Sequence, residues 1–261
     1  MTEDSVRLKH RELEKIAMTA LRMARVLTEC GARVRVAQQG AGLVVQGLGV
    51  ETVGIRTGYA SQEITVRSGA NTITRMMSIG PHGVNHRLDH AMRRLAVRVS
   101  KGGLSIAEVE AEMDRLALET PRHPLWFVAL AVGIACAAFG RLLGIDWLAF
   151  GPVFLGGAIG QGLRMLMHRR GVNAYVVAAV IAFVASVIAG YGARLFASST
   201  VNLSMMAAIL LLVPGIPVTN AQTDVMDGYP SMGSARAVTV LMVMIFATTG
   251  VLIAEGILGL R

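Results

Sequence analysis

The chain has 261 residues, of which 53% are hydrophobic and 16% are charged, and its formal net charge is +8. Its mean hydropathy of +0.55 exceeds what one soluble domain of this size requires, which argues against a purely soluble protein. Membrane proteins gather Lys and Arg on their cytoplasmic face, so the basic balance does not indicate a nucleic-acid partner.

The charge is distributed unevenly along the chain. Residues 1–122 carry 18 of the 25 Lys and Arg and 13 of the 17 Asp and Glu. We therefore predict a polar domain over 1–122 and a membrane domain over 123–261. No apolar stretch follows the polar N-terminus, so no cleavable signal is expected and the first domain should lie in the cytosol. Cys30 and Cys136 fall in different domains, and both are interpreted as packing residues.

The first domain is expected to have an α+β fold. Apolar residues recur at helical spacing over residues 11–30, and the period changes to two after Glu51. Ser105 with Glu108 three residues later is a capping box that opens another helix. The predicted elements are helices over 11–30 and about 34–48, strands beginning near Glu51, Ile64 and Thr72, and helices over 84–99 and 105–118.

The second domain is expected to be an α-helical polytopic membrane bundle, because about 20 apolar residues are needed to cross about 30 Å of hydrocarbon. Five segments qualify or nearly so: Leu125–Leu143, Trp147–Met167, Ala174–Gly192, Leu203–Thr219 and Ala237–Leu258. Their flanking arginines favour an N-terminus inside and a C-terminus outside. On the inner side are Arg122, Arg164, Arg169, Arg170 and Arg236; on the outer side are Arg141, Arg194 and Arg261.

Small residues recur at a spacing of four in these spans, a pattern that lets helices approach closely in lipid. They predict a tight bundle or an oligomer interface, although glycine and alanine are also simply common in spans. The pairs and runs are Gly140 with Gly144, Gly156 with Gly160, and Ala178, Ala182, Ser186 and Gly190.

The fourth span is predicted to be broken, because Pro214 and Pro217 flank Gly215. Polar backbone freed at membrane depth is tolerated only inside protein or beside a water-filled cavity, so such a break indicates a transport site. If the helix resumes after Pro217, its N-terminus suits a substrate carboxylate, with Asn220 and Asp224 as polar contacts.

Two charged residues near the break have more than one interpretation. Asp224 either pairs with a substrate ammonium or takes up a coupling proton, since carboxylates in membranes are usually functional; alternatively it is a solvated loop residue. Arg236 is a positive-inside anchor, a partner of Asp224, or a fork that holds an anionic substrate. Arg164 and Glu255 are interpreted as interfacial anchors.

Histidines at positions 82, 86 and 90 have the spacing of zinc ligands on one helix face. Pro81 and Gly83 indicate that the helix starts after His82, so His86 and His90 are interpreted as a solvated face and no metal site is predicted. The sequence offers no paired nucleophile and base and no nucleotide-binding glycine fingerprint. We therefore predict neither an enzyme nor a cofactor.

The segment from Leu210 to Arg236 resembles the signature of the threonine/serine exporter family, of the ThrE and YjjP type. The corner Glu29–Ala32 and the entry Arg122–Trp126 also sit where similar proteins have them. The pattern of Pro-Gly, Asn, Asp, Gly, Gly and Arg falls on Pro214, Gly215, Asn220, Asp224, Gly228, Gly233 and Arg236.

The resemblance implies an exporter of small hydrophilic metabolites in a bacterial inner membrane, driven by the proton gradient. Exporters of the fused form continue into a second hydrophobic domain, whereas this sequence ends at Arg261. It therefore resembles the split form, which implies a separate short membrane subunit or a homo-oligomer. The fused form implies threonine and serine as substrates and the split form implies succinate, so the substrate, the coupling ion and the stoichiometry stay open.

Two functions of different classes follow. The first is an exporter subunit with Pro214, Gly215, Pro217, Asn220, Asp224 and Arg236 on the translocation route. The second is a membrane-anchored cytosolic binding or regulatory domain whose spans serve only as an anchor. A pure anchor has no use for a broken helix followed by amide and carboxylate groups, which favours the first.

Overall fold

The structure is a computed structural model, and it describes residues 10–121 and 123–259. Its residues form two compact units. Unit 1 comprises residues 10–121 together with Ile216–Ala237, and unit 2 comprises residues 123–215 and 238–259. Arg122 and Arg261, two of the arginines used to predict the orientation, lie outside the described residues.

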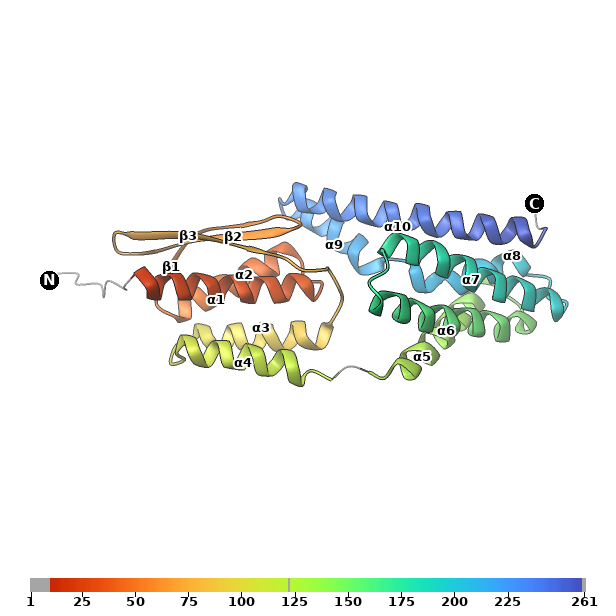
Figure 1. Cartoon of the computed structure of the whole chain (residues 1–261), viewed down its shortest axis with the longest axis horizontal. Coiled ribbons are helices and arrows are strands. Elements are labelled where there is room, and N and C mark those ends of the chain that lie inside the picture. Colours follow the sequence, from red (N-terminus) through yellow and green to blue (C-terminus); the bar gives the residue numbers. More distant parts are fainter. Residues whose placement is uncertain (1–9, 122, 260–261) are drawn as a thin grey trace. The chain divides into compact units, whose positions relative to one another are not determined.

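The predicted order of elements over the first part of unit 1 is confirmed. Two helices, three strands and two further helices follow one another: α1 (His10–Glu29), α2 (Val34–Gly47), β1 (Glu51–Thr57), β2 (Ser61–Ser68), β3 (Asn71–Ser78), α3 (His86–Ser100) and α4 (Ile106–Glu119). In Figure 1 the sheet lies on one side of α1 and α2, and α3 and α4 lie on the other.

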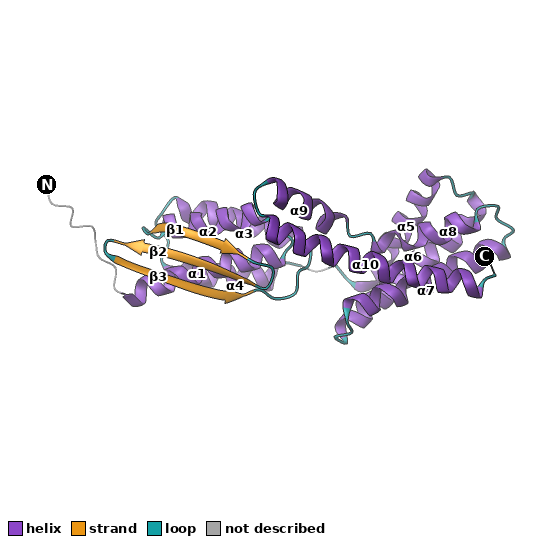
Figure 2. Ribbon diagram, turned by 90° about the horizontal axis from the view of Figure 1, so that it is seen from above, coloured by secondary structure: helices purple, strands orange, loops and turns teal. Residues whose placement is uncertain are grey.

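The sheet is an antiparallel meander with β2 in the centre, as Figure 2 shows. Val66 of β2 pairs with Thr52 on one side and Ile73 on the other, and a bulge follows Thr52. Alternate residues of β2 are buried, including Ile64 and Val66. This alternation gives the sheet one apolar face, which packs on α1 and α2.

Side-chain caps fix where α3 and α4 begin. The Asn85 side chain accepts a hydrogen bond from the Leu88 amide at 3.2 Å, so α3 begins at His86, after His82 as predicted. The predicted capping box between Ser105 and Glu108 is present at the start of α4. Each cap satisfies backbone N–H groups that have no acceptor within the helix.

Unit 1 also contains the second half of the signature segment, residues 210–236. This second half, which begins at Ile216, lies in α9 (Gly215–Met226) and in the first two turns of α10 (Pro230–Ile257). Gly228 has a positive φ of 88° and ends α9 at a tight turn. The short connection places α9 and the start of α10 next to each other, within one compact body with α1 and α2.

Unit 2 is helical, and three described helices are long and apolar enough to cross a membrane: α5 (Leu125–Leu143), α7 (Ala174–Leu195) and α10. A fourth crossing results if the broken pair Val201–Leu212 and Gly215–Met226 counts as one span. The remaining long helix, α6 (Trp147–Arg169), carries glycines, Pro152 and a basic C-terminus. An apolar segment with a bend of 61° at its break is thus present, whereas the predicted total of five spans stays a prediction.

Small residues in unit 2 lie where helices cross closely. A Cβ on Gly156 would lie 2.8 Å from the Ala185 carbonyl oxygen, and one on Gly250 would lie 2.2 Å from that of Ala179. Among the alternatives for these residues, packing within the bundle is observed for Gly156. Gly144 has another role, because its φ of 104° makes it the left-handed cap of α5.

The helix resumes before Pro217 and not after it, so the condition set out above from the sequence is not met. The segment before the break consists of α8 (Val201–Ala208) and the 3-10 helix η1 (Ile209–Leu212), and α9 already begins at Gly215. Pro217 is therefore the third residue of α9. The first four amides of a helix have no acceptor within it, so a proline at this position forfeits no helical hydrogen bond.

Candidate functional site

The helix break is satisfied by backbone and side-chain partners. Val213 is extended, with φ −62° and ψ 114°, and its amide donates to the Leu210 carbonyl at 3.1 Å. Pro214 has no amide to donate. The Leu211 carbonyl, left without a helical donor, accepts a hydrogen bond from Nη1 of Arg164 at 2.9 Å. The break in unit 2 is therefore held by a cation from α6.

Asp224 and Arg236 form a buried ion pair in unit 1. Nη1 of Arg236 lies 2.6 Å from Oδ2 of Asp224, and their side chains are 6% and 0% exposed. Burying two charges is costly unless further hydrogen bonds satisfy their remaining polar atoms. Arg236 was interpreted as an anchor, as a partner of Asp224 or as a fork for an anionic substrate. The structure shows the contact with Asp224.

The second carboxylate oxygen of Asp224 caps α2. Oδ1 accepts a hydrogen bond from the Val34 amide at 3.0 Å, although the two residues are 190 positions apart. Arg33, the residue that precedes α2, makes no side-chain cap of its own. A carboxylate at this helix end satisfies a free amide and interacts favourably with the helix dipole.

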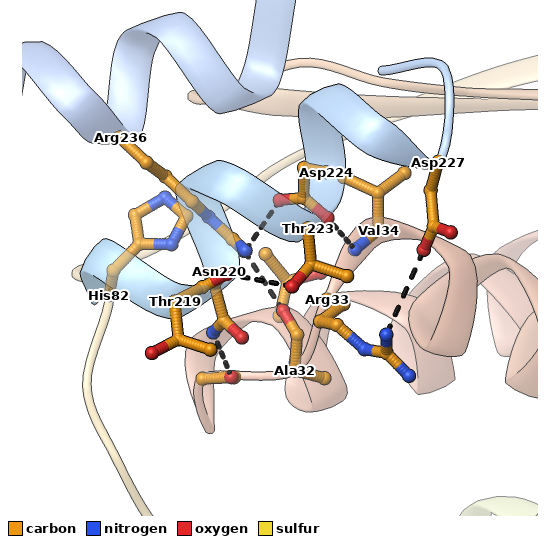
Figure 3. Close-up of polar contacts among 12 residues, drawn as sticks. Ala32, Arg33, Val34, His82, Thr219, Asn220, Thr223, Asp224, Asp227 and Arg236 are labelled. Carbon is orange, nitrogen blue, oxygen red and sulfur yellow. Dashed lines mark hydrogen bonds and ion pairs between the residues drawn. The ribbon is translucent and has the colours of Figure 1, made fainter. Parts of the chain in front are cut away.

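The corner between α1 and α2, residues 30–33, supplies the other acceptors. Nη2 of Arg236 donates to the Ala32 carbonyl at 2.9 Å, and Nδ2 of Asn220 donates to the Gly31 carbonyl at 2.8 Å. Figure 3 shows the side chains of Asn220, Asp224 and Arg236 converging on this corner. Gly31 has a φ of 93°, and a Cβ there would lie 2.8 Å from the Gly83 carbonyl oxygen. Glycine thus makes the corner sharp enough to present its carbonyls.

Gly233 allows α10 to pack closely on α9. A Cβ at this position would lie 2.5 Å from Cγ2 of Val225 and 2.7 Å from the Ala221 carbonyl oxygen. Arg236 is three residues further along the same helix, so this close approach brings its guanidinium within reach of Asp224. The spacing of Asp, Gly, Gly and Arg in the signature segment thereby has a structural explanation.

A looser set of contacts surrounds the buried pair. Asp227 lies 3.3 Å from Nη1 of Arg35 and 3.9 Å from Nη1 of Arg33. The Tyr229 hydroxyl donates to Oε1 of Gln38 at 2.8 Å. The arginines of these pairs are 43% and 60% exposed, so solvent weakens these pairs more than it weakens the buried Asp224–Arg236 pair.

His82 lies beside Arg236 (Figure 3) and stacks on Tyr59, with ring centroids 4.4 Å apart. A ring nitrogen of His82 is 2.9 Å from the Tyr59 carbonyl oxygen. Burial lowers the pKa of His82, the Tyr59 hydrogen bond opposes that shift, and the Arg236 charge lowers the pKa further. The neutral imidazole is therefore favoured next to the ion pair.

Other candidate reactive groups are accounted for. His86 and His90 are exposed on α3, and the described residues contain no group of three or more His, Cys, Asp or Glu that could hold a metal ion. Burial, followed by the Asp89 and Glu29 charges, raises the pKa of the Cys30 thiol to about 11. This thiol is protonated at neutral pH and is a poor nucleophile.

The six predicted site residues do not all come together. Asn220, Asp224 and Arg236 meet at the α1–α2 corner. Pro217 lies in the first turn of α9, the helix that also carries Asn220 and Asp224. Pro214 and Gly215 belong to unit 2.

Sequence reasoning missed the partners of these residues. The corner at residues 29–32 and the signature segment each resembled the family, but nothing in their spacing indicated that they bind each other. Arg164 was interpreted as an anchor. The available signal for its contact with Leu211 was that the segment beside α6 contains two prolines, Pro214 and Pro217.

Comparisons with known proteins agree on one family. A family model described as "Putative threonine/serine exporter" matches residues 18–258. "Probable succinate transporter subunit YjjP" of Klebsiella aerogenes is 25% identical over 251 residues, 96% of each chain. The protein of the same name from Escherichia coli is 27% identical over 215 residues, 82% of this chain and 83% of that protein.

A more distant relative is "Probable threonine/serine exporter" of Mycobacterium tuberculosis, which is 22% identical over 182 residues. These residues are 70% of this chain and 34% of that protein. No solved structure matches the chain. Because the family model spans residues 18–258, and because three long apolar helices are present, the chain is a bacterial membrane protein that belongs to the threonine/serine exporter family.

Proposed function

We propose that this chain is a subunit of an inner-membrane exporter that moves small amino acids or small carboxylates out of the cell, coupled to the proton gradient. The observation that carries the proposal is a bent apolar segment, long enough in total for one span, that continues along the chain into a buried Asp224–Arg236 pair. Buried charges are costly wherever they lie, and transporters form substrate and ion sites at broken spans.

The proposed topology has five spans. In addition to α5, α7 and α10, it includes α6 and the broken pair formed by Val201–Leu212 and Gly215–Met226. With 23 residues, α6 is about 35 Å long at about 1.5 Å per residue, enough to cross the hydrocarbon. Residues 1–122 lie in the cytosol, residues 123–261 carry the spans, and the C-terminus lies outside. The contact between Arg164 near the end of α6 and Leu211 near the end of η1 supports a common inner level for both ends.

Asp224 is the proposed proton acceptor. Its two oxygens are bound by the α2 amide at Val34 and by Arg236. Protonation would remove the charge that both partners bind, so α9 would be held less firmly at the corner. A two-state element of this kind is what a coupling proton has to bias. Pro214, Gly215, Pro217 and Asn220 complete the proposed translocation route.

A second membrane subunit or a further copy of the chain is the proposed partner. Two relatives are named as transporter subunits. Large apolar side chains are exposed along α5 and α10, including Trp126, Ile134, Leu241 and Ile253. Such faces are suited to contact with lipid or with another membrane subunit.

The test is export from vesicles that contain the full chain, alone and with a candidate partner subunit. Wild-type protein should export threonine, serine or succinate under an imposed proton gradient, and Asp224→Asn should lose export while keeping membrane insertion. Asp227→Asn is the matched control, because Asp227 is a neighbouring carboxylate whose ion pairs are more exposed. Export by Asp224→Asn at the wild-type rate would contradict the role of Asp224. The absence of any flux would favour a membrane-anchored binding or regulatory domain.

A further inference from the structure

A cation with free donors is the strongest partner for a substrate carboxylate, and Arg236 does not provide one in this structure. Its Nη1 is bound by Asp224 and its Nη2 by the Ala32 carbonyl, and the residue is 6% exposed. Its charge is matched within unit 1. A cation that pairs with an anionic substrate would therefore come from elsewhere in the chain or from a partner.

Arg164 is the cation at the break itself. It is partly buried in α6, and Nη1 donates to the Leu211 carbonyl at 2.9 Å. Within the described residues, no acceptor binds its Nε or Nη2 and no carboxylate forms an ion pair with it. The single bond to Leu211 holds the guanidinium beside the broken helix while the edge that forms bidentate pairs stays unused.

The acidic residues of unit 2 are engaged or placed elsewhere. They are Asp146 and Glu255. Asp146 caps α6 at the Ala149 amide at 2.9 Å and accepts from the Ser198 hydroxyl at 2.8 Å. Glu255 lies in the last turns of α10. Unit 2 thus offers a free cation next to its break without a neighbouring anion that would pair with an ammonium group.

We propose that Arg164 binds a carboxylate of the exported molecule at the break, and that this site prefers small carboxylates without an ammonium group to zwitterionic amino acids. The inference rests on the proposed export function and names its substrate class. A partly buried arginine without a counter-ion is costly in a membrane span. A bidentate carboxylate would supply both the missing charge and two acceptors.

The interpretation as an anchor makes a different prediction. An interfacial anchor only has to reach the headgroup region, so lysine should replace arginine without loss. A carboxylate fork depends on the planar guanidinium, and lysine should not reproduce it. Substituting Arg164 with Lys therefore separates the two roles while keeping the positive charge.

The experiment uses the full chain, with its partner subunit where flux requires one, in vesicles loaded with succinate or with threonine. For succinate, Arg164→Gln should lower kcat/KM by about 10- to 100-fold, the range expected for one lost charge-assisted hydrogen-bonded contact. Arg164→Lys should raise the succinate KM about tenfold. Arg169→Gln, an exposed arginine one turn further along α6, should behave like wild type.

A binding measurement provides the second readout. Succinate should raise the melting temperature of detergent-purified wild-type protein and of Arg169→Gln, but not that of Arg164→Gln. Threonine should have less effect on the wild type. If Arg164→Gln does not insert, Arg164→Lys carries the test alone.

The outcomes separate the two proposals. Absence of flux for every substrate in the wild type would contradict the export function. Export with an unchanged succinate KM in Arg164→Lys, or an equal loss of succinate and threonine export in Arg164→Gln, would overturn the role of Arg164 in carboxylate binding.

Discussion

Helix ends meet at the α1–α2 corner of unit 1, whereas the helices of unit 2 cross along their lengths. At the corner, the free amide of Val34 and the carbonyls of Gly31 and Ala32 are matched by Asn220, Asp224 and Arg236. In unit 2, glycines and alanines allow helices to pack closely, and the backbone groups at these contacts are already hydrogen-bonded within their own helices.

The difference follows from where backbone polar groups are free. A helix has unpaired groups only at its ends, so a contact between ends needs polar or charged side chains. A contact between the middles of helices needs only space. The α1–α2 corner of unit 1 should therefore be sensitive to the loss of charge, and the helix crossings of unit 2 to the gain of volume.

The largest effect is expected from Asp224→Ala. This change leaves Arg236 buried without its counter-ion and removes the cap of α2, which should cost about 3–5 kcal/mol of stability. Faster hydrogen exchange at the first amides of α2, together with denaturant unfolding of the purified protein, measures the loss. Adding Arg236→Met should restore part of the stability, because no unpaired charge then stays buried.

Asp227→Ala is the control for this prediction. The Asp227 side chain is 15% exposed, but its partners Arg33 and Arg35 are 43% and 60% exposed, so its loss should cost less than the loss of Asp224, on the order of 1 kcal/mol. Equal losses in the Asp224 and Asp227 variants would mean that the buried pair is not the principal contact at the corner.

The next effect tests space in unit 2. Gly250→Ala would place a Cβ 2.2 Å from the Ala179 carbonyl oxygen and 2.9 Å from the Phe183 amide nitrogen. Backbone atoms cannot rotate away, so α7 and α10 must separate, at a cost of about 1–3 kcal/mol. Thermal melting in detergent measures the change.

Gly256→Ala is the matched control in the same helix, because a Cβ there meets open space. It should be neutral or stabilising by less than about 1 kcal/mol, since alanine favours helix. A Gly250→Ala variant as stable as Gly256→Ala would contradict the close crossing of α7 and α10.

Sequence reasoning predicted what depends on local pattern. Ser105 with Glu108 identified a helix start, the alternation around Ile64 and Val66 identified a strand, and Pro214 identified the break. Each of these signals is carried by residues within a few positions of one another. Local sequence also placed residues 216–237 in the predicted membrane domain. The structure instead groups them in one compact unit with residues 10–121.

The partners of the buried pair could not be predicted in this way. Asp224 caps a helix that starts at Val34, 190 positions earlier. The acceptors at Gly31 and Ala32 are backbone carbonyls, which every residue has, so no residue type marked them as binding partners. Arg33 stands before α2 and cannot cap it with its side chain, which indicated that the cap comes from another group. This signal does not identify the group, because water or any nearby loop can satisfy the free amides of a helix.

A smaller effect is expected from Asn220→Ala. It removes one hydrogen bond, from Nδ2 to the Gly31 carbonyl at 2.8 Å, and should cost about 0.5–1.5 kcal/mol. Thr223→Ala is the control on the same helix, because the Thr223 hydroxyl only donates to the Thr219 carbonyl one turn earlier. Hydrogen exchange in α9 should rise in the first variant and stay unchanged in the second. Equal exchange in both would mean that Asn220 does not hold α9 at the corner.

The smallest effect is a pH dependence that should be confined to unit 1. Burial and then, in the same direction, the Arg236 charge lower the pKa of His82 below 6.5, against the Tyr59 hydrogen bond and the Glu29 charge. The folded state therefore binds fewer protons than the unfolded state just below pH 6.5. Stability from this group is present above that pH and is lost as the pH falls toward the folded pKa.

His82→Phe keeps an aromatic ring on Tyr59 but cannot be protonated. Between pH 7.5 and pH 5.5, hydrogen exchange at the α2 amides should accelerate more in the wild type than in this variant, whereas His86→Gln, a change at an exposed position, should follow the wild type. Fluorescence of Trp126 and Trp147, both in unit 2, should show no His82-dependent change, because that packing depends on space rather than on charge. Parallel pH curves for the wild type and His82→Phe would mean that protonation of His82 does not weaken the contacts of the Asp224–Arg236 pair at the corner.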